Sequence, residues 1–448
     1  MASLTDLAKR VVVTACAMTH TTERAANRFG VTPFLPKLHA DRITHLGGMP
    51  PDEFRQQLAA CRSFEDARWV GYWSGFARDH LSRADGALSR LGAPGSHVLL
   101  DPAAAPDLRA LGELLAPAVT ILADRGTVAD PAAVARFCAE HPEATDAAYA
   151  LDGLIKAIVY ELAAAWPGWS PQRLAAYQRG RRLSEALLTA LAPAMNMTLE
   201  TVQVPINDDD IVRGILMLPL DQDGPVPTVL VTNGLEGTIE EALFPLLAQR
   251  DGGVGTFVME MPGTYSYREP MSVASEDAYR RVIDFLVAHP AVDGDRLGMM
   301  GFSFGAYWSS RMPAVDPRLK VAVSNGALTD HSFKAFGSVG MPEIIASTLR
   351  NTTGATSMAD MGRRLAKYSL AQYYRQIQAP LLVINGSRDT LISTQDSIDL
   401  AIGAPNAQLV LYDGDDHCAM GHAEQWSELS ARFIREHLLA SDTVAAAK

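Results

Sequence analysis

The chain predicts a doubly wound α/β fold with a mostly parallel sheet, preceded by a helical N-terminal region. Residues 1–195 carry helical periodicity and lack the alternation that is typical of strands. From residue 196 onward, short apolar runs alternate with helical segments, as in a parallel sheet covered by helices. Glycine-rich and polar segments follow several of these runs, at the sheet edge where doubly wound folds bind ligands.

The helical N-terminal region is expected to form a cap domain over residues 1–195. Proline and glycine separate its periodic segments, which are 64–83, 107–115, 131–140, 147–165 and 171–191. Ser170 and Pro171 form a suitable start for the last of these. Residues 9–16 faintly resemble a lipoprotein signal, but their apolar run is short, so we expect an amphipathic helix opened by Ser3 or Thr5.

The second half, residues 196–440, is expected to be the catalytic domain, followed by a flexible tail at 441–448. Strands are predicted at 199–206, 211–218, 228–232, 255–259, 297–300, 319–324, 381–384 and 408–412. Helices are predicted at 276–288, 304–312, 395–402 and 422–439. Residues 330–370 interrupt this rhythm and are expected to form a small helical insertion over the site.

Composition narrows the range of partners. A net charge of −12 without any basic run argues against nucleic acid and against an anionic membrane surface. The four cysteines have no pairing pattern, which favours reduced thiols and a cytoplasmic protein. There is no apolar run of about 20 residues and no metal-ligand spacing, so we expect a small-molecule substrate, no membrane partner, no metal and no cofactor.

The most informative motif is Gly301-Phe302-Ser303-Phe304-Gly305, which follows a predicted strand and precedes a predicted helix. It matches G-x-S-x-G, the nucleophile elbow of α/β-hydrolases. In that turn the serine has a strained backbone and an exposed hydroxyl, and larger side chains two positions away would collide. Ser303 is therefore the candidate nucleophile.

A serine nucleophile needs a histidine to take its proton and a carboxylate to orient that histidine. Asp389 lies just beyond a predicted strand, and His417 follows the next one. Their order after the serine is the order that this fold requires. Asp396 and Asp399 are poorer candidates because they fall inside a predicted helix, and His422 is expected in the first turn of the last helix.

The oxyanion of an acyl-transfer reaction needs two backbone donors. The N–H of Phe304 is the first candidate, and the loop after strand 228–232 is expected to supply the second, from Leu235 with Gly234 shaping the loop. Five further residues are candidates for the pocket wall, although packing or solvation explains them at least as well. They are Glu236, Tyr265, Tyr307, Trp308 and His331.

These motifs resemble those of α/β-hydrolases of the FrsA-like type, the group of 2,6-dihydroxypseudooxynicotine hydrolase and the fungal polyketide-shortening hydrolases. The resemblance includes residues 233–236, 260–263 and 293–305, followed by Asp389 and His417. It implies a Ser-His-Asp hydrolase with a helical cap, often dimeric through that cap. Several relatives cleave carbon–carbon bonds next to a ketone, and others cleave esters.

We therefore expect a homodimeric serine hydrolase acting on an ester or on a β-diketone or polyketide-like molecule. Two alternatives remain open. Prolyl-oligopeptidase-like peptidases share a similar catalytic domain but carry a β-propeller in front of it. A ligand-binding receptor on a hydrolase scaffold is the alternative from another class, and the intact Ser303, Asp389 and His417 set argues against it.

Overall fold

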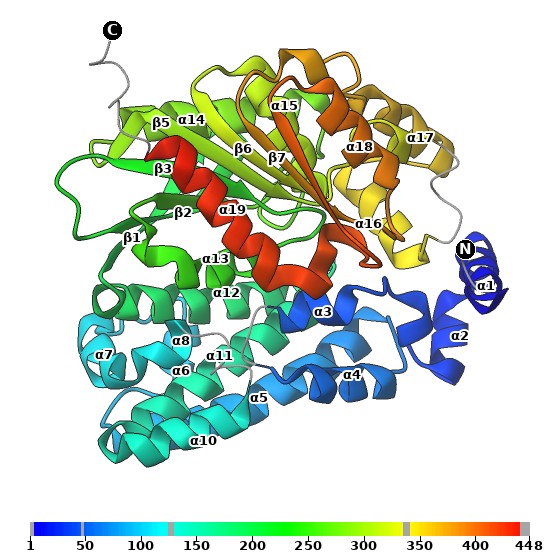
Figure 1. The fold of residues 1–448 in the computed structure, drawn as a ribbon. Coiled ribbons are helices and arrows are strands. Elements are labelled where there is room, and N and C mark those ends of the chain that lie inside the picture. Colours follow the sequence, from blue (N-terminus) through cyan, green and yellow to red (C-terminus); the bar gives the residue numbers. More distant parts are fainter. Residues whose placement is uncertain (1–3, 46–48, 124–129, 335–340, 440–448) are drawn as a thin grey trace, which may run out of the picture.

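The computed structural model describes residues 4–45, 49–123, 130–334 and 341–439. Its centre is an eight-stranded sheet with the order β1-β2-β4-β3-β5-β6-β7-β8 (Figure 1). The β1–β2 and β2–β4 pairs are antiparallel and the others are parallel, which confirms the predicted doubly wound, mostly parallel sheet. The strands are β1 (Met197–Pro205), β2 (Ile211–Pro219), β3 (Val226–Thr232), β4 (Gly255–Met259), β5 (Val292–Phe302), β6 (Leu319–Asn325), β7 (Leu381–Gly386) and β8 (Ala407–Tyr412).

Helices cover both faces of this sheet. Successive residues of a strand point to opposite faces, so Val229 and Val231 enter one apolar core while Leu230 enters the other. The first core contains side chains of α13 and α19, and the second contains side chains of α14, α15 and α18. The helices of this half are α13 (Ile239–Leu246), α14 (Glu276–Ala288), α15 (Phe304–Val315), α16 (Glu343–Thr352), α17 (Met358–Leu365), α18 (Thr394–Gly403) and α19 (Ala423–Leu438).

The region before the sheet is helical throughout its described part, as predicted. Its helices are α1 (Leu4–Thr19), α2 (Thr22–Phe29), α3 (His39–Thr44), α4 (Pro51–Ala60), α5 (Asp66–Arg90), α6 (Ser96–Leu100), α7 (Leu108–Leu115), α8 (Val119–Ala123), α10 (Pro131–Glu140), α11 (Thr145–Ala165) and α12 (Pro171–Leu191). Helix α11 is the centre of this region, because every residue from 153 to 165 is buried. It approaches α5 closely at Gly153, where a Cβ atom would lie 2.9 Å from that of Ala84.

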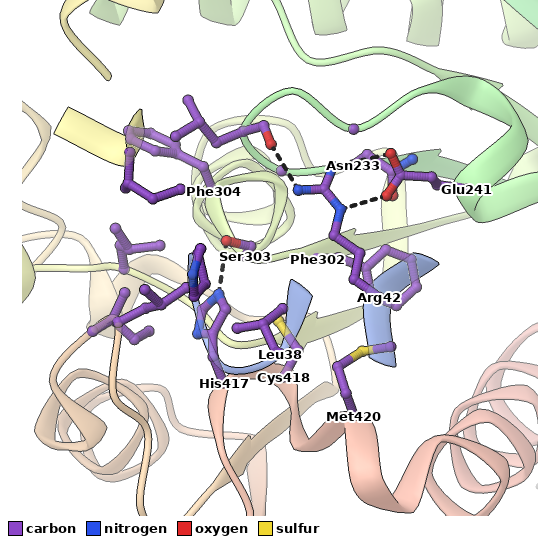
Figure 2. Close-up of a pocket in the computed structure, with 18 of the residues that line it drawn as sticks. Leu38, Arg42, Asn233, Glu241, Phe302, Ser303, Phe304, His417, Cys418 and Met420 are labelled. Atoms are coloured by element: carbon purple, nitrogen blue, oxygen red, sulfur yellow. Dashed lines mark hydrogen bonds and ion pairs between the residues drawn. The ribbon is translucent and has the colours of Figure 1, made fainter. Parts of the chain in front are cut away.

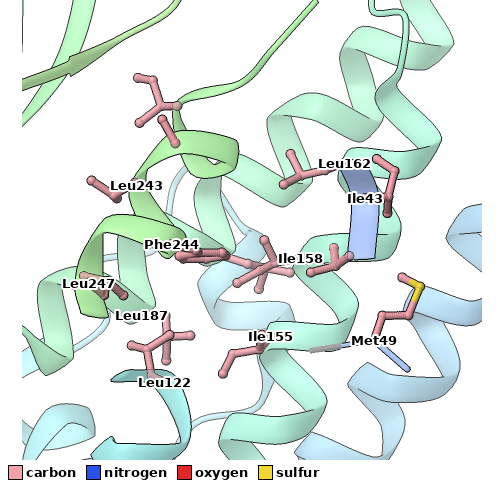
Figure 3. Close-up of a cluster of buried hydrophobic side chains, with 14 of the residues drawn as sticks. Ile43, Met49, Leu122, Ile155, Ile158, Leu162, Leu187, Leu243, Phe244 and Leu247 are labelled. Carbon is pink, nitrogen blue, oxygen red and sulfur yellow. The ribbon is translucent and has the colours of Figure 1, made fainter. Parts of the chain in front are cut away.

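One apolar core joins the two halves of the chain. Figure 3 shows Phe244 of α13 pointing towards Ile158 of α11. The same cluster continues into the sheet through Val231. The α/β half and the helical region are therefore packed through α13, and burial of this shared surface contributes to the stability of both.

The sequence did not indicate several short helices, namely α2, α3, α4, α6, α8 and α13. Isolated helices shorter than about 12 residues are marginal in water, so tertiary packing rather than local pattern stabilises them. Helix α13 did carry a local signal, since the N–H of Thr238 bonds the Glu241 carboxylate at 3.3 Å across its first turn.

Some expected elements lie partly or wholly outside the described residues. The expected insertion at 330–370 contains α16 and α17, while its residues 335–340 are not described. The tail at 441–448 is not described, nor is Ser3, although Thr5 falls within α1. Among the described residues, none of the helices has the length and apolar character needed to cross a bilayer.

Candidate active site

Ser303 stands between β5 and α15 with φ 55° and ψ −121°, a backbone conformation that residues with a side chain rarely adopt. Its neighbours explain why the turn contains two glycines. A Cβ atom on Gly301 would collide with the carbonyl oxygen of Gly305, and one on Gly305 would lie 2.5 Å from that of Asn233. The strained turn presents the Ser303 hydroxyl at the carboxyl end of the sheet.

Three side chains far apart along the chain meet at this edge. His417 Nε2 lies 2.8 Å from Ser303 Oγ, and His417 Nδ1 lies 2.7 Å from Asp389 Oδ2 (Figure 2 shows the first contact). Asp389 follows β7, and His417 follows β8. Because the carboxyl ends of these parallel strands meet at one edge, the sheet itself brings the three residues together.

The carboxylate of Asp389 is held in place by further donors. Its Oδ1 accepts the backbone N–H groups of Leu391 at 2.8 Å and Ile392 at 2.9 Å, and its Oδ2 accepts Asn385 Nδ2 at 2.9 Å. These bonds leave Oδ2 directed at the ring of His417. The orientation suits a carboxylate that fixes the tautomer of a histidine base.

Burial and charge act in opposite directions on this pair. Burial alone would raise the pKa of Asp389, but the His417 charge and the bonds from His417, Ile392 and Asn385 hold that pKa below its ordinary value. Burial likewise opposes the charge of His417, but the Asp389 carboxylate and, after it, Cys418 outweigh burial, so the pKa of His417 lies well above its ordinary value. The imidazole is thus a stronger base than a free histidine.

The other candidates for the triad carboxylate and for the base have structural partners instead. Asp396 accepts the backbone N–H groups of residues 330–332 at 2.6–3.0 Å and thereby anchors the loop after β6. Asp399 pairs with His331 at 2.9 Å. His422 precedes α19, pairs with Asp415 at 2.8 Å and stacks on the ring of Tyr412.

The loop after β3 packs directly against the nucleophile. A Cβ atom on Gly234 would lie 2.6 Å from the Cβ atom of Ser303 and 3.0 Å from the amide nitrogen of Phe304. A tight turn follows, in which the N–H of Gly237 bonds the carbonyl of Gly234 at 3.1 Å. Phe304 begins α15, so its N–H has no partner within the helix. Gly234 and the N–H of Phe304 therefore lie beside Ser303, and Leu235 follows Gly234 in the same loop.

Ser303 and His417 line a cavity of about 190 Å³. Its wall is mostly apolar and comes from both halves of the chain (Figure 2). The apolar side chains include Leu38 and Trp166 from the helical region and Leu235, Leu246, Phe302, Phe333, Ile345, Leu349, Met420 and Trp426 from the α/β half. Within the described part of the chain, no group of three or more His, Cys, Asp or Glu side chains is arranged to hold a metal ion.

The five residues expected on the pocket wall lie elsewhere, which corrects that expectation. Tyr307 and Trp308 are buried in the second core, where they pack around Tyr368. They follow Ser303 by about one turn of α15, where the Tyr307 ring also contacts Phe333 and the Trp308 ring contacts Tyr279 of α14, and neither side chain lines the cavity. His331 faces Asp399 in the loop after β6.

Glu236 belongs to the loop after β3, and Tyr265 packs against that loop. The Tyr265 hydroxyl donates to the backbone carbonyl of Glu236 at 3.1 Å, and its ring stacks on Tyr177 with centroids 4.5 Å apart. The Glu236 side chain is 1% exposed, and burial raises its pKa to about 8. Neither side chain lines the cavity.

Sequence reasoning missed Arg42 and Glu241, which line the cavity and form an ion pair there. Arg42 Nε lies 2.6 Å from Glu241 Oε2, and the Arg42 guanidinium also reaches the loop after β3 (Figure 2). The two residues are 199 positions apart, and no local motif marks either of them. Glu260, expected in a shaped loop, is 1% exposed, bonds Tyr177 and Ser266, and has its pKa raised to about 7 by burial.

Comparison with known families gives the site its context. The profile of the family described as Esterase FrsA-like matches residues 134–410. This chain belongs to that family. The membership confirms the resemblance inferred from the motifs and the α/β-hydrolase fold.

Individual relatives are distant. A 2,6-dihydropseudooxynicotine hydrolase of Paenarthrobacter nicotinovorans is 23% identical over 54% of this chain, and Esterase FrsA of Yersinia pestis strain Pestoides F is 22% identical over 55%. The aligned parts span 65% and 63% of those relatives' own lengths, less than two thirds.

Two solved structures share the fold. A 2,6-dihydroxy-pseudo-oxynicotine hydrolase aligns over 89% of this chain and 96% of its own, with a TM-score of 0.63 and 19% identity. A structure of AbyA5 aligns over 70% of this chain and 90% of its own, with a TM-score of 0.56 and 21% identity.

Proposed function

We propose that this protein is a serine hydrolase in which Ser303 is the nucleophile, His417 the base and Asp389 the residue that orients it. The observation that carries the proposal is the continuous chain of contacts from Ser303 Oγ to His417 at 2.8 Å and from His417 to Asp389 at 2.7 Å. The strained backbone of Ser303 supports it, because such strain is concentrated at functional sites.

In the first half of the reaction, His417 Nε2 takes the proton of Ser303 as Oγ attacks the substrate carbonyl carbon. The negative charge that forms on the carbonyl oxygen is stabilised by the N–H groups of Phe304 and Leu235. The imidazolium, held by Asp389, then gives its proton to the leaving group as the tetrahedral intermediate collapses. An acyl group remains on Ser303.

In the second half, His417 takes a proton from water, which attacks the acyl carbon. The second intermediate collapses, His417 returns the proton to Ser303 Oγ, and a carboxylic acid leaves. For an ester the first leaving group is an alkoxide, whereas for a β-diketone it is an enolate carbanion that His417 protonates. The same residues serve both reactions.

We further propose a small, mostly apolar substrate, either an ester or a β-diketone or polyketide-like ketone. The apolar wall of the 190 Å³ cavity supports this class. The name of a structural neighbour, 2,6-dihydroxy-pseudo-oxynicotine hydrolase, supports the option of a ketone. A cytoplasmic location and a homodimer remain part of the proposal, and all four cysteines are free thiols, in agreement with a reducing compartment.

The two alternatives gain no support. A prolyl-oligopeptidase-like enzyme would carry a β-propeller ahead of its catalytic domain, but the described residues before β1 form helices. A receptor with a silent site has no need for a nucleophile in contact with its base, as Ser303 is with His417.

The test is Ser303→Ala in purified protein. Wild-type protein should label with a fluorophosphonate probe and hydrolyse a member of a panel of aryl esters and β-diketones, with products identified by mass spectrometry. The variant should lose labelling and at least about 10⁴-fold in kcat, because removing the nucleophile of a triad has effects of this size. Undiminished hydrolysis by the variant would exclude the mechanism.

A further inference from the structure

Arg42 belongs to the short helix α3 of the helical region, yet its side chain reaches the catalytic loop. The α3 helix packs against residues 417–422, which carry the base. From there the Arg42 guanidinium donates to the carbonyl oxygen of Glu236 at 2.8 Å and to that of Leu235 at 3.5 Å. It thus holds two successive carbonyls of the loop that supplies the proposed oxyanion donor.

That loop needs to be held. Glu236 has φ 54°, a left-handed conformation that costs a residue with a side chain about 1 kcal/mol or more. Within the turn the carbonyl of Gly234 is engaged by the N–H of Gly237. Since the N–H and C=O groups of one trans peptide point in opposite directions, this bond directs the N–H of Leu235 away from the turn. Any relaxation of the turn would re-aim that N–H.

The positive charge of Arg42 is balanced by a carboxylate beside it. Glu241 of α13 accepts Arg42 Nε at 2.6 Å and Nη2 at 2.9 Å, a two-point contact that fixes the plane of the guanidinium. Both side chains are mostly buried, with exposed fractions of 20% and 12%. The Trp166 ring, 6.0 Å from the guanidinium, covers the pair. Arg42 is therefore fixed at one end by α13 and at the other by the loop.

We propose that Arg42 is a positioning residue of the hydrolytic site, which holds the carbonyls of Leu235 and Glu236 so that the Leu235 N–H stays aimed at the developing oxyanion. The inference rests on the proposed serine-hydrolase function and extends it. The helical region then does more than form a wall of the cavity, because it supplies a group on which stabilisation of the transition state depends.

The first test compares Arg42→Gln with wild type, using 4-nitrophenyl butanoate as substrate and an aryl trifluoromethyl ketone as a mimic of the oxyanion adduct on Ser303. A mis-aimed donor weakens the transition state more than the ground state, so kcat should fall about 30- to 100-fold while KM changes less than about threefold. The dissociation constant of the ketone, measured by calorimetry, should rise by a similar factor. Arg42→Lys should recover part of the loss.

A second variant separates positioning from simple charge neutralisation. Arg42→Gln leaves the Glu241 carboxylate unpaired beside the cavity, which alone could disfavour an oxyanion. In Arg42→Gln/Glu241→Gln that charge is gone and the loop is still not held. Positioning therefore predicts that the double variant stays impaired, and a return to wild-type kcat would overturn the proposal.

Arg179→Gln is the matched control. Arg179 pairs with the buried carboxylate of Glu161 within the helical region and does not line the cavity. Its loss should lower thermal stability while kcat and ketone affinity stay within about twofold. An equal fall in kcat for Arg179→Gln would make the Arg42 effect a consequence of general destabilisation and reject positioning.

Tyr265→Phe covers the case in which the Arg42 variants do not fold. It removes only the hydroxyl that bonds the same Glu236 carbonyl, so a smaller fall in kcat, about 3- to 10-fold at constant KM, is expected. Unchanged ketone affinity in all folded variants would reject the proposal. Absence of ketone binding and labelling in wild type would instead count against the serine-hydrolase function itself.

Discussion

The helical region and the α/β region contribute to the site by different physical means. The α/β region supplies the reacting groups, each placed by the end of a strand, as with Ser303 after β5 and His417 after β8. The helical region supplies wall residues such as Leu38 and the guanidinium of Arg42, which reach the cavity only because α3 packs beside residues 417–422. Main-chain hydrogen bonding positions the first set, and side-chain packing positions the second.

The largest expected effect comes from comparing alanine substitutions at two histidines of the α/β region. His417→Ala should lower kcat by about 10⁴-fold or more, because the base for Ser303 is lost. His422→Ala, five residues further along, should stay within about threefold, since His422 pairs with Asp415, stacks on Tyr412 and does not line the cavity. Steady-state kinetics with an activated ester measures both, and a comparable loss in the two variants would contradict the assignment of the base.

A smaller effect tests whether the two regions share one core. Phe244→Ala empties a buried position between α13 and α11, and the free energy of unfolding should fall by about 3–5 kcal/mol. Thermal or urea unfolding should remain a single transition. Phe29→Ala, on an exposed face of α2, is the control and should change stability by less than about 0.5 kcal/mol. Two separate transitions, only one of them shifted by Phe244→Ala, would show that the regions unfold independently.

The smallest expected effect is a shift of the pH profile. His417 acts as a base only when neutral, and Asp389 raises its pKa above the ordinary value, so kcat/KM should rise with pH along a limb centred above about 6.5. Asp389→Asn removes the raising charge while burial, which lowers the pKa of His417, remains. The limb of the residual activity should then move to lower pH.

Asp415→Asn provides the matched control for this profile, because Asp415 pairs with His422 rather than with His417. The rise of kcat/KM with pH in Asp415→Asn should coincide with that of the wild type. A limb that stays in place in Asp389→Asn, or that moves equally in Asp415→Asn, would mean that the carboxylate of Asp389 does not set the basicity of His417.

The success of the sequence predictions followed the same division between the two regions. Strand positions in the α/β region were predictable because short continuous apolar runs mark strands that are buried on both faces, and chain order then put Ser303, Asp389 and His417 at one edge, where the structure has them. Tyr307 and Trp308 were misplaced because periodicity alone does not say which residues of a helix next to a nucleophile face the cavity and which pack against other segments, here Tyr279 and Tyr368. No local sequence pattern indicated Arg42 or Glu241, because the two paired residues are 199 positions apart.

The amino-acid sequence by itself determined the layered architecture, the strained serine turn with its two glycines, and the order of the three polar residues along the sheet edge. These depend on local backbone geometry and on short-range apolar patterns, which a linear sequence carries. Only the tertiary structure decided which residues enclose the cavity and which group holds the loop at residues 234–237. Those features arise from packing between segments that are remote along the chain, where each partner's role depends on the position of the other.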